Sequence, residues 1–270
     1  MQLDSFKNIP LSPEALVGIR AALEAGELLR KGFGTSFAIH AKEGVHNLVT
    51  EYDHASEKLI ISSIKKHYPD HSFLAEEGGK VAGNSFQWVI DPLDGTVNFA
   101  HGIPFFAVTL ALRKGAETLF GVVYQPLSQE LFVAQKGLGS FLNGKKLQVS
   151  PVQEIQRAFL VTGFPYNLRE NPHHCIEHFI DILRLGIPIR RLGVAALDLS
   201  YVAAGRFDGF FEVSLAPWDC AAGNLLIELA GGKVSSWKGS PFSIDSYEPI
   251  LASNGAIHNQ LCNILSRSIQ

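Results

Sequence analysis

The chain has 270 residues, of which 46% are hydrophobic, and it carries a formal net charge of -3 at pH 7. This length suffices for one large domain or two small ones, and the hydrophobic content suffices for a sizeable core. The nearly balanced charge provides no electrostatic footprint for nucleic acid or for an anionic membrane surface. Contact with nucleic acid or a transcription complex is therefore not supported by charge.

The cysteines and the first residues narrow the class of protein further. Cys175, Cys220 and Cys262 are odd in number, widely spaced and outside any CxxC pair, which argues against a disulfide framework or a structural zinc site. Residues 1–10 lack the apolar stretch of a signal peptide, and no run of about 18 apolar residues occurs. We expect a cytoplasmic protein without a membrane span.

Two helices are predicted in the first 70 residues. Ser12, Pro13 and Glu14 have the order of an N-cap, a first-position proline and a first-turn acid, so a helix is expected from there to the glycines near residue 32. A second helix is expected from about Thr50 until Pro69 stops it, with Asp53 in its first turn. The apolar stripes predicted to be buried are Leu16, Ile19, Leu23 and Leu28 in the first helix and Ala55, Leu59, Ile60 and Ile64 in the second.

Beyond residue 85 the pattern indicates strands. Predicted strands at 86–90, 106–113, 118–125, 130–135 and 140–148 form a mainly antiparallel sheet. From residue 158, strands near 158–162, 187–191, 208–213, 233–236 and 249–253 alternate with helices near 172–184, 194–205, 218–230 and 256–268. No linker-like segment separates these halves, so we predict one α/β domain over residues 1–270, with subregions 1–150 and 151–270.

Two motifs resemble a nucleotide-binding loop and a zinc site, but neighbouring residues argue against both interpretations. Residues 139–146 approach a P-loop, but Lys146 stands where a magnesium-binding hydroxyl is required, and Asn143–Gly144 is better explained as a type I′ hairpin turn. His174, Glu177 and His178 fit the HxxEH pattern of some zinc peptidases. We expect these three on the solvated side of their helix, because a buried stripe is predicted at Ile176, Phe179, Ile180 and Leu183.

Several acidic residues have both a structural and a functional explanation. Glu76 and Glu77 follow a short apolar strand, so that only one of them can face a given site. Asp219 opens a helix and would serve as its cap. Glu212 ends a strand. It would be either a charge at the rim of the protein surface or a hydrogen-bond acceptor for the hydroxyl groups of a ligand.

Asp91 and Asp94 are the strongest indication of a site. They end the apolar strand that begins near residue 86, and a glycine and a threonine follow them. Two carboxylates about 4 Å apart repel each other by roughly 4 kcal/mol at an effective dielectric constant of 20. A bound cation would remove this repulsion, so the pair predicts a metal site.

The succession of these motifs resembles the inositol monophosphatase family, and specifically its bacterial extragenic suppressor branch. The matching segments, in chain order, are residues 47–53, Glu76–Glu77, Asp91–Thr96, Thr162–Pro165, Arg190–Asp198 and Trp218–Gly223. The resemblance implies an αβαβα sandwich, a phosphomonoesterase that hydrolyses myo-inositol monophosphates, and two to three Mg²⁺ ions per site. It also implies sensitivity to lithium and a homodimer.

Roles carried over from the family divide into three sets. The resemblance implies that Glu76, Asp91, Leu93 (through its carbonyl), Asp94 and Asp219 hold metal. It implies that Thr96 and Asp53 orient the attacking water, with Glu76 also counted as catalytic. The implied substrate-binding residues are Asp94, Gly95, Thr96, Arg190, Gly193, Val194, Ala195, Glu212 and Asp219.

Two positions depart from the family pattern. Asn47 stands where some relatives carry aspartate, and Val194 stands where animal enzymes carry threonine, so that one hydroxyl contact to inositol is lost. Fructose-1,6-bisphosphatase, histidinol-phosphatase and nucleotide 3′-phosphatase activities on the same scaffold remain alternatives. Association with RNA or the transcription machinery, known for some bacterial relatives, is an alternative of a different class.

Overall fold

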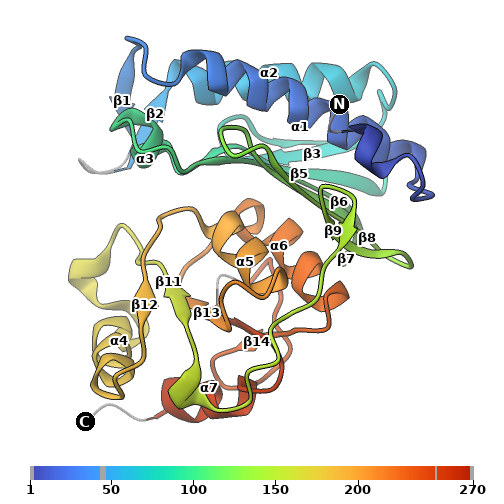
Figure 1. Ribbon diagram of the computed structural model, residues 1–270. Coiled ribbons are helices and arrows are strands. Elements are labelled where there is room, and N and C mark those ends of the chain that lie inside the picture. The colour runs from blue at the N-terminus through green and yellow to red at the C-terminus, as the bar shows by residue number, and fades with distance from the viewer. Residues whose placement is uncertain (1–2, 43–46, 247, 268–270) are drawn as a thin grey trace.

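The computed structural model describes residues 3–42, 47–246 and 248–267. Its elements form five layers in the order helices, sheet, helices, sheet, helices (Figure 1). Three hydrophobic cores fill the spaces between these layers. The predicted αβαβα sandwich is confirmed.

The first half forms a large sheet of eight strands. Their order is β10-β9-β8-β7-β6-β5-β3-β4, and every pairing except β3 with β5 is antiparallel. The strands are β3 (Ser72–Ala75), β4 (Gly79–Val81), β5 (Phe86–Asp94), β6 (Ala107–Lys114), β7 (Glu117–Gln125), β8 (Glu130–Gln135), β9 (Gly139–Leu142) and β10 (Lys145–Lys146). A separate two-stranded sheet pairs β1 (Ile39–Ala41) with β2 (Leu48–Thr50).

The strand predicted at 140–148 is two strands joined by a tight turn. Asn143 and Gly144 between them both have positive φ, as a type I′ turn requires. The hairpin interpretation of this segment is therefore confirmed.

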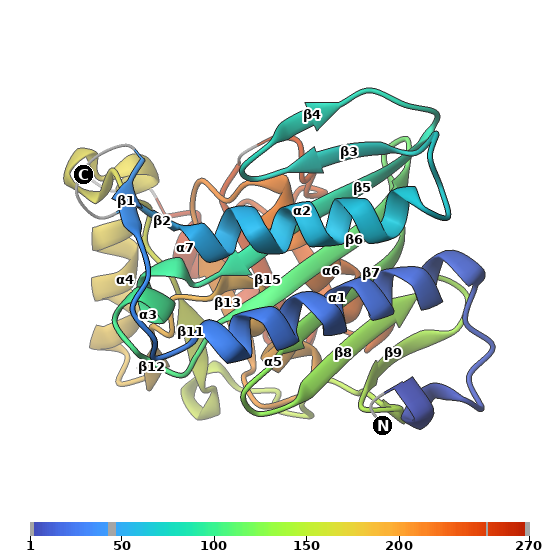
Figure 2. The ribbon, with the colours of Figure 1, turned by 90° about the horizontal axis from the view of Figure 1, so that it is seen from above.

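Helices α1 (Pro13–Gly32) and α2 (Glu51–Lys65) lie side by side across one face of this sheet (Figure 2). The buried face of α1 is made largely of alanine and glycine, and of the predicted stripe only Ile19 is fully buried. A Cβ at Gly18 would lie 2.7 Å from Phe120 and 2.9 Å from Trp88. The helix thus approaches the large aromatic side chains of the sheet through its smallest residues.

The buried face of α2 differs from the prediction at its N-terminal end. Ala55 is exposed, whereas Asp53, Ser56 and Glu57 are buried. The Ser56 hydroxyl donates to the Pro92 carbonyl oxygen at 2.8 Å. The polar residues are buried because this end of the helix packs against the end of β5, so the polarity of these residues did not indicate which face of the helix is buried.

The second half forms a mixed five-stranded sheet in the order β12-β11-β13-β15-β14. Strand β11 is parallel to β12 and β13, whereas β15 is antiparallel to β13 and β14. The strands are β11 (Leu160–Thr162), β12 (Ile189–Arg190), β13 (Gly209–Glu212), β14 (Lys233–Ser236) and β15 (Ile250–Ser253). All five lie within the predicted ranges.

The remaining helices of the described chain cover the two faces of the second sheet, except for the shortest, which follows β5 and lies beside β2 (Figure 1). They are α3 (Thr96–Ala100), α4 (Cys175–Arg184), α5 (Ala195–Ala203), α6 (Pro217–Leu229) and α7 (His258–Leu265), with 3₁₀ turns at Leu3–Phe6, Ile155–Arg157, Leu168–Glu170 and Pro172–His174. Residue 268, the predicted end of the last helix, lies outside the described residues. None of the helices in the described part of the chain is long and apolar enough to cross a membrane.

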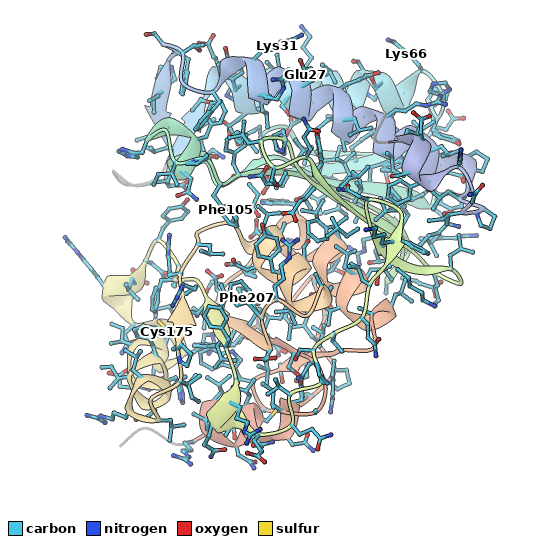
Figure 3. All side chains as sticks on the ribbon, viewed as in Figure 1. Glu27, Lys31, Lys66, Phe105, Cys175 and Phe207 are labelled. Carbon is cyan, nitrogen blue, oxygen red and sulfur yellow. The ribbon has the colours of Figure 1, made fainter. Side chains whose placement is uncertain are left out.

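Helices α5 and α6 form the layer between the two sheets. Gly121 of β7 allows close approach there, because a Cβ at that position would lie 2.9 Å from the Ala222 backbone. Phe105 and Phe207, both labelled in Figure 3, contact Tyr201 of α5 with ring centroids 5.9 and 6.1 Å apart. This shared core joins the two halves into one body.

Helix α4 packs by a face other than the predicted one. His178 is buried with Cys175 and Ile182, whereas Ile176, Ile180 and Leu183 are 36%, 38% and 46% exposed. The buried face fits against Trp237, whose ring lies 5.2 Å from that of His178. The prediction of a solvated His178 was therefore wrong, because hydrophobicity alone did not determine which face met the sheet.

Candidate active site

A cavity of about 620 Å³ collects most of the residues singled out in the sequence. It lies where the ends of β3 and β5 meet the first turns of α3 and α6. The predicted site residues that line it are Glu76, Asp91, Leu93, Asp94, Gly95, Thr96, Gly193 and Asp219.

Strand β5 delivers two of the carboxylates, and it runs further than predicted, through Asp94. Its pairing with β6 is irregular between Asp91 and Asp94, which turns the chain at this point. Asp91 is buried, and its Oδ1 accepts from the Leu93 amide at 3.0 Å. The local backbone thus holds the first carboxylate in place.

Asp94 and Asp219 each accept a backbone amide at a helix start. Asp94 Oδ2 accepts from the Ala196 amide in the first turn of α5 at 2.7 Å. Asp219 Oδ2 accepts from the Ala216 amide at the start of α6, also at 2.7 Å. The capping role expected for Asp219 is present, and the same side chain still reaches the cavity.

Asp53 and Thr96 are in direct contact. Thr96 Oγ1 donates to Asp53 Oδ1 at 2.9 Å and also lies 3.0 Å from the Leu93 carbonyl oxygen. The other carboxylate oxygen, Asp53 Oδ2, accepts from the Thr50 amide at 2.7 Å and from the Thr50 hydroxyl at 2.6 Å. Asp53 is buried behind Thr96, and Thr96 lines the cavity.

Gly95 is required by the turn between the carboxylates and α3. Its φ is +94°, and a Cβ there would lie 2.7 Å from Val194 Cγ2. Any side chain would strain the backbone and also push α5 away. The Asp-Gly-Thr order therefore allows a close approach between β5, α3 and α5.

The first turns of α2, α3, α5 and α6 all converge on this region. Each supplies a residue: Asp53 at the third position of α2, Thr96 at the first of α3, Ala195 at the first of α5 and Asp219 at the third of α6. Unpaired amides and the positive end of each helix favour negative charge at such positions. The fold therefore suits both the carboxylates and an incoming anion.

Glu76 and Glu77 share a partner, Lys42, that the sequence did not reveal. Lys42 Nζ lies 2.8 Å from Glu76 Oε1 and also contacts Glu77 Oε1. The Glu77 amide donates to Glu57 of α2 at 2.9 Å. Of the two acids only Glu76 lines the cavity, as the alternation of side chains along a strand predicted.

The carboxylates raise one another's pKa. Burial raises the pKa of Asp91 well above its ordinary value, and Glu76, Asp94 and Asp219 raise it further. Burial raises the pKa of Asp94 to about 7 and that of Asp53 to about 6, although hydrogen bonds to both carboxylates oppose this effect. Burial also raises the pKa of Asp219.

This donor set fits magnesium better than zinc or copper. The predicted ligands among the lining residues would offer carboxylate oxygens and one backbone carbonyl, the ligands that a hard divalent cation prefers. The raised pKa values show that the carboxylates together need a countercharge. As they stand, no three His, Cys, Asp or Glu side chains among the described residues are grouped closely enough to hold a metal ion by themselves. Water would therefore have to complete the coordination, as is common for Mg²⁺.

A small recess of about 140 Å³ adjoins the cavity, and all its lining residues except Asp94 come from the second half of the chain. Val194, Ala195 and Glu212 lie there, together with the cavity residues Asp94 and Gly193. A Cβ at Gly163 would lie 2.1 Å from Glu212 Oε2, so this glycine makes room for the carboxylate. Burial raises the pKa of Glu212 to about 8.

Arg190 lines neither the cavity nor the recess, and unlike Asp53 it makes no hydrogen bond to a predicted site residue in the described part of the chain. Its guanidinium lies 4.9 Å from the Phe159 ring centroid and donates to the Ile189 carbonyl oxygen. Arg191 lines both hollows instead. The sequence contained both arginines, but the direction of each at the end of β12 depends on a one-residue register that it did not reveal.

Asn98 is a further cavity residue that the sequence did not indicate. Its Nδ2 donates to the carbonyl oxygens of Phe105 and Leu192, each at 2.9 Å. It therefore ties α3 to the segment before Gly193 and joins the two sides of the cavity. Tyr166 and Trp218 also line the cavity.

Comparison with known proteins places these features in a family. The model described as "Inositol monophosphatase family" matches residues 11–270. The protein "Nus factor SuhB" of Escherichia coli K12 is 44% identical over 232 residues, which is 85% of this chain and 87% of that protein.

Solved structures agree with this match. The extragenic suppressor protein suhB from Bartonella henselae has a TM-score of 0.90 at 37% identity, covering 96% of this chain and 100% of that one. An inositol monophosphatase from Anabaena has a TM-score of 0.82 at 38% identity, covering 98% of this chain and 96% of the other.

Proposed function

Because the chain belongs to the inositol monophosphatase family, whose members are generally Mg²⁺-dependent, we propose that it is a phosphomonoesterase acting on myo-inositol monophosphates. The observation that carries the proposal is the Thr96–Asp53 hydrogen bond beside a cavity lined by four carboxylates. This combination offers a proton acceptor and a cation site within one hollow. Release of inorganic phosphate from inositol monophosphate, with and without Mg²⁺, tests it.

Five residues would hold the cations. We assign Glu76, Asp91 and the Leu93 carbonyl to one Mg²⁺, and Asp91, Asp94 and Asp219 to a second, with a third more weakly held near Glu76. Bound Mg²⁺ supplies charge for the phosphoryl oxygens and the leaving oxygen and lowers the pKa of the attacking water. By resemblance we also expect Li⁺ to compete at the position near Asp219.

The chain's own residues would position the water and the phosphate. Thr96 Oγ1 donates to the Asp53 carboxylate, so the hydroxyl would pass its own proton to Asp53 while its oxygen takes a proton from the attacking water. The Gly95 and Thr96 amides in the first turn of α3 face the phosphate. Glu76 would help to orient the same water, and Lys42 would have to release Glu76 for this role.

Selectivity would come from the recess. Glu212 accepts hydroxyls of the substrate ring, while Gly193, Val194 and Ala195 shape the space beside it. Val194 is fully apolar and offers no hydroxyl contact. We therefore propose Arg191, rather than Arg190, as the arginine that faces the substrate.

The main alternative is another sugar phosphatase on the same scaffold, of the fructose-1,6-bisphosphatase or histidinol-phosphatase type. A panel of phosphate esters at fixed Mg²⁺ separates these activities by kcat/KM. We expect the highest kcat/KM of the panel for inositol monophosphate. A higher kcat/KM for fructose 1,6-bisphosphate or histidinol phosphate would reassign the substrate while leaving the metal site in place.

A homodimer is part of the proposal, and α4 is where we place its contact. The exposed apolar residues on this helix and just after it are Ile176, Ile180, Leu183 and Leu185. Their burial against a second copy would gain free energy. Light scattering should show a dimer that Ile180→Glu with Leu183→Glu turns into a monomer. Lys66→Glu, at the far side of the molecule (Figure 3), should leave the dimer intact.

The relatives named Nus factor favour a second role, as a partner of the transcription machinery. This role would be independent of catalysis. Pull-down from the native cell should recover RNA polymerase equally with the unmodified protein and with Asp91→Asn. Recovery with neither protein would contradict this role.

A further inference from the structure

A second cavity, of about 510 Å³, lies on the side of the second sheet covered by α4 and α7. It shares no residue with the active-site cavity or its recess. Its lining combines the histidines at the start of α4 with residues after β14 and at the end of α7. They include His173, His174, His178, Trp237, Lys238 and Arg267.

His178 is the most informative residue of this cavity. It is 4% exposed, and its Nδ1 is buried without a hydrogen-bond partner among the described residues. The ring stands edge-on to Trp237 and lines the cavity. Either protonation state of an imidazole needs hydrogen-bond partners, so burial without one costs roughly 1–3 kcal/mol.

The other buried histidines of the described chain show how this cost is normally avoided. His258, which is 0% exposed, has Ser235 Oγ at 2.7 Å from Nε2 and Ser253 Oγ at 2.8 Å from Nδ1. His71, which is 8% exposed, accepts from Trp88 Nε1 at 3.1 Å. His178 alone of the three lacks any such contact, and it alone lines this cavity.

The charges around the cavity indicate the chemistry of the missing partner. Lys238 and Arg267 are exposed at its rim, and neither has a salt bridge within the described residues. Glu248 is the only carboxylate in the lining. Two cations and an imidazole against one carboxylate favour a negatively charged group.

A metal ion fits these residues less well. Glu248 is the one carboxylate among the described lining residues, and the positive charges of Lys238 and Arg267 would repel a cation. His174 instead lies 4.0 Å from Glu177, at the outer side of the helix. Trp237, Pro249 and Leu265 provide apolar walls, which suit the carbon skeleton of an organic anion.

We propose that this cavity binds a small oxyanion, a phosphate or a carboxylate, whose oxygen pairs with His178 and whose charge is balanced by Lys238 and Arg267. The site is separate from the proposed phosphatase centre and does not depend on it. Phosphate and carboxylate share the chemistry that these residues recognise, so both serve as probes.

The test follows the imidazole nitrogen signals of His178 by NMR in metal-free protein at constant ionic strength. His178→Gln identifies the signals. Titration with inorganic phosphate, and separately with succinate, should move them to a plateau with a dissociation constant of about 1 mM. If only one probe brings the signals to a plateau, the site prefers that anion, phosphate or carboxylate. If both do, the site accepts either anion.

Matched variants connect the signal to the cavity. Lys238→Gln with Arg267→Gln should weaken binding about tenfold or more, since both exposed charges are lost without disturbing the core. Lys233→Gln, an exposed lysine that lies on β14 outside the cavity, should change nothing. Unmoved His178 signals with both probes would mean that no oxyanion reaches the imidazole. Equal binding by the double variant would mean that Lys238 and Arg267 do not hold the anion, and either result would overturn the proposal.

Discussion

The two sides of the active-site cavity are built in different ways. On the metal side, Asp91, Asp94 and Asp219 each accept a backbone amide, and Asp53 accepts an amide and two hydroxyls. On the substrate side, Glu212 lies in a recess with no hydrogen bond of its own among the described residues, and Arg191 lines the same recess without a salt bridge there. The metal side is therefore pre-organised by the backbone, whereas the substrate side keeps its polar groups available.

This difference suggests a division of labour. Groups fixed by the main chain can hold a constant geometry for chemistry, while groups held only by packing can be changed to suit another ring. Substitutions on the metal side should therefore lower kcat for every substrate. Substitutions on the substrate side should act on KM and differ between substrates.

The largest effect is expected for Asp91→Asn. An amide provides one weaker oxygen in place of a charged pair, at the carboxylate that we assign to both main cations. Phosphate release should fall by about 10⁴-fold or more, and added Mg²⁺ should not restore it. Circular dichroism checks the fold. Strong activity of this variant, or of the unmodified protein in EDTA, would contradict the assigned metal role.

The next largest effect concerns the Thr96–Asp53 pair. Thr96→Ala and Asp53→Asn should each lower kcat by roughly 10²- to 10⁴-fold, because a positioned acid–base group is lost. Calorimetry should find Mg²⁺ affinity little changed. The double variant should be scarcely worse than either single one, since both residues act in one step.

A control separates the relay from helix capping. Thr50→Val removes the hydroxyl that caps α2 and one hydrogen bond to Asp53 Oδ2, but keeps the Thr50 amide and the Thr96–Asp53 bond. It should cost about 1 kcal/mol of stability and leave most of the activity. If Thr50→Val were as inactive as Thr96→Ala, or if the two single losses multiplied, the relay would be the wrong explanation.

A smaller and selective effect is expected for Glu212→Gln. It should raise KM for inositol monophosphate about tenfold and leave KM for an aryl phosphate nearly unchanged, because only the ring hydroxyls lose a charged acceptor. Equal losses on both substrates would place Glu212 on the metal side of the comparison.

The two neighbouring arginines provide a matched pair. Arg191→Gln should raise KM for inositol monophosphate by about threefold to tenfold, whereas Arg190→Gln should have no effect on KM, since only Arg191 lines the cavity. Steady-state kinetics on both variants decides this. A larger effect for Arg190 would support the original sequence-based assignment.

The smallest effect concerns pH and metal-free stability. Asp94 and Glu212 have pKa values raised to about 7 and about 8, so the folded protein holds protons that the unfolded chain has already released. Stability of the metal-free protein should therefore fall as pH rises from about 5 to about 8, by several degrees in melting temperature, and should level off above about pH 8. Mg²⁺ should oppose this loss most strongly at the higher pH. A metal-free melting temperature that rises over this range would contradict the raised values.

Much of the fold and of the metal side could be predicted from the sequence. The strand before Asp91, the turn at Gly95 and the helix start at Asp53 are local features, and local patterns in residue order determine them. The five-layer order followed from the change of pattern near residue 150 together with the family resemblance. Glu76 was ambiguous alone and was assigned only through that resemblance.

The incorrect predictions have a common physical cause. The buried face of a helix, and the direction of a side chain at the end of a strand, depend on partners that are distant in the sequence. Ala55 is exposed because α2 turns polar residues toward the site, and His178 is buried because α4 meets Trp237. Lys42 reaches Glu76 across 34 positions of the chain, which no local pattern reveals. Arg190 and Arg191 differ by one position, and their directions are set only when β12 pairs with β11.

The four carboxylates of the cavity come from both halves of the chain, and this has a consequence for how the molecule opens. Glu76, Asp91 and Asp94 come from the first half of the chain, whereas Asp219 comes from the second. Cations shared among them would fasten the two halves across their junction. Separation of the halves would then require metal loss, so that metal concentration would slow both subglobal opening and cleavage by proteases. A site built for chemistry would in this way also govern the lifetime of the folded protein.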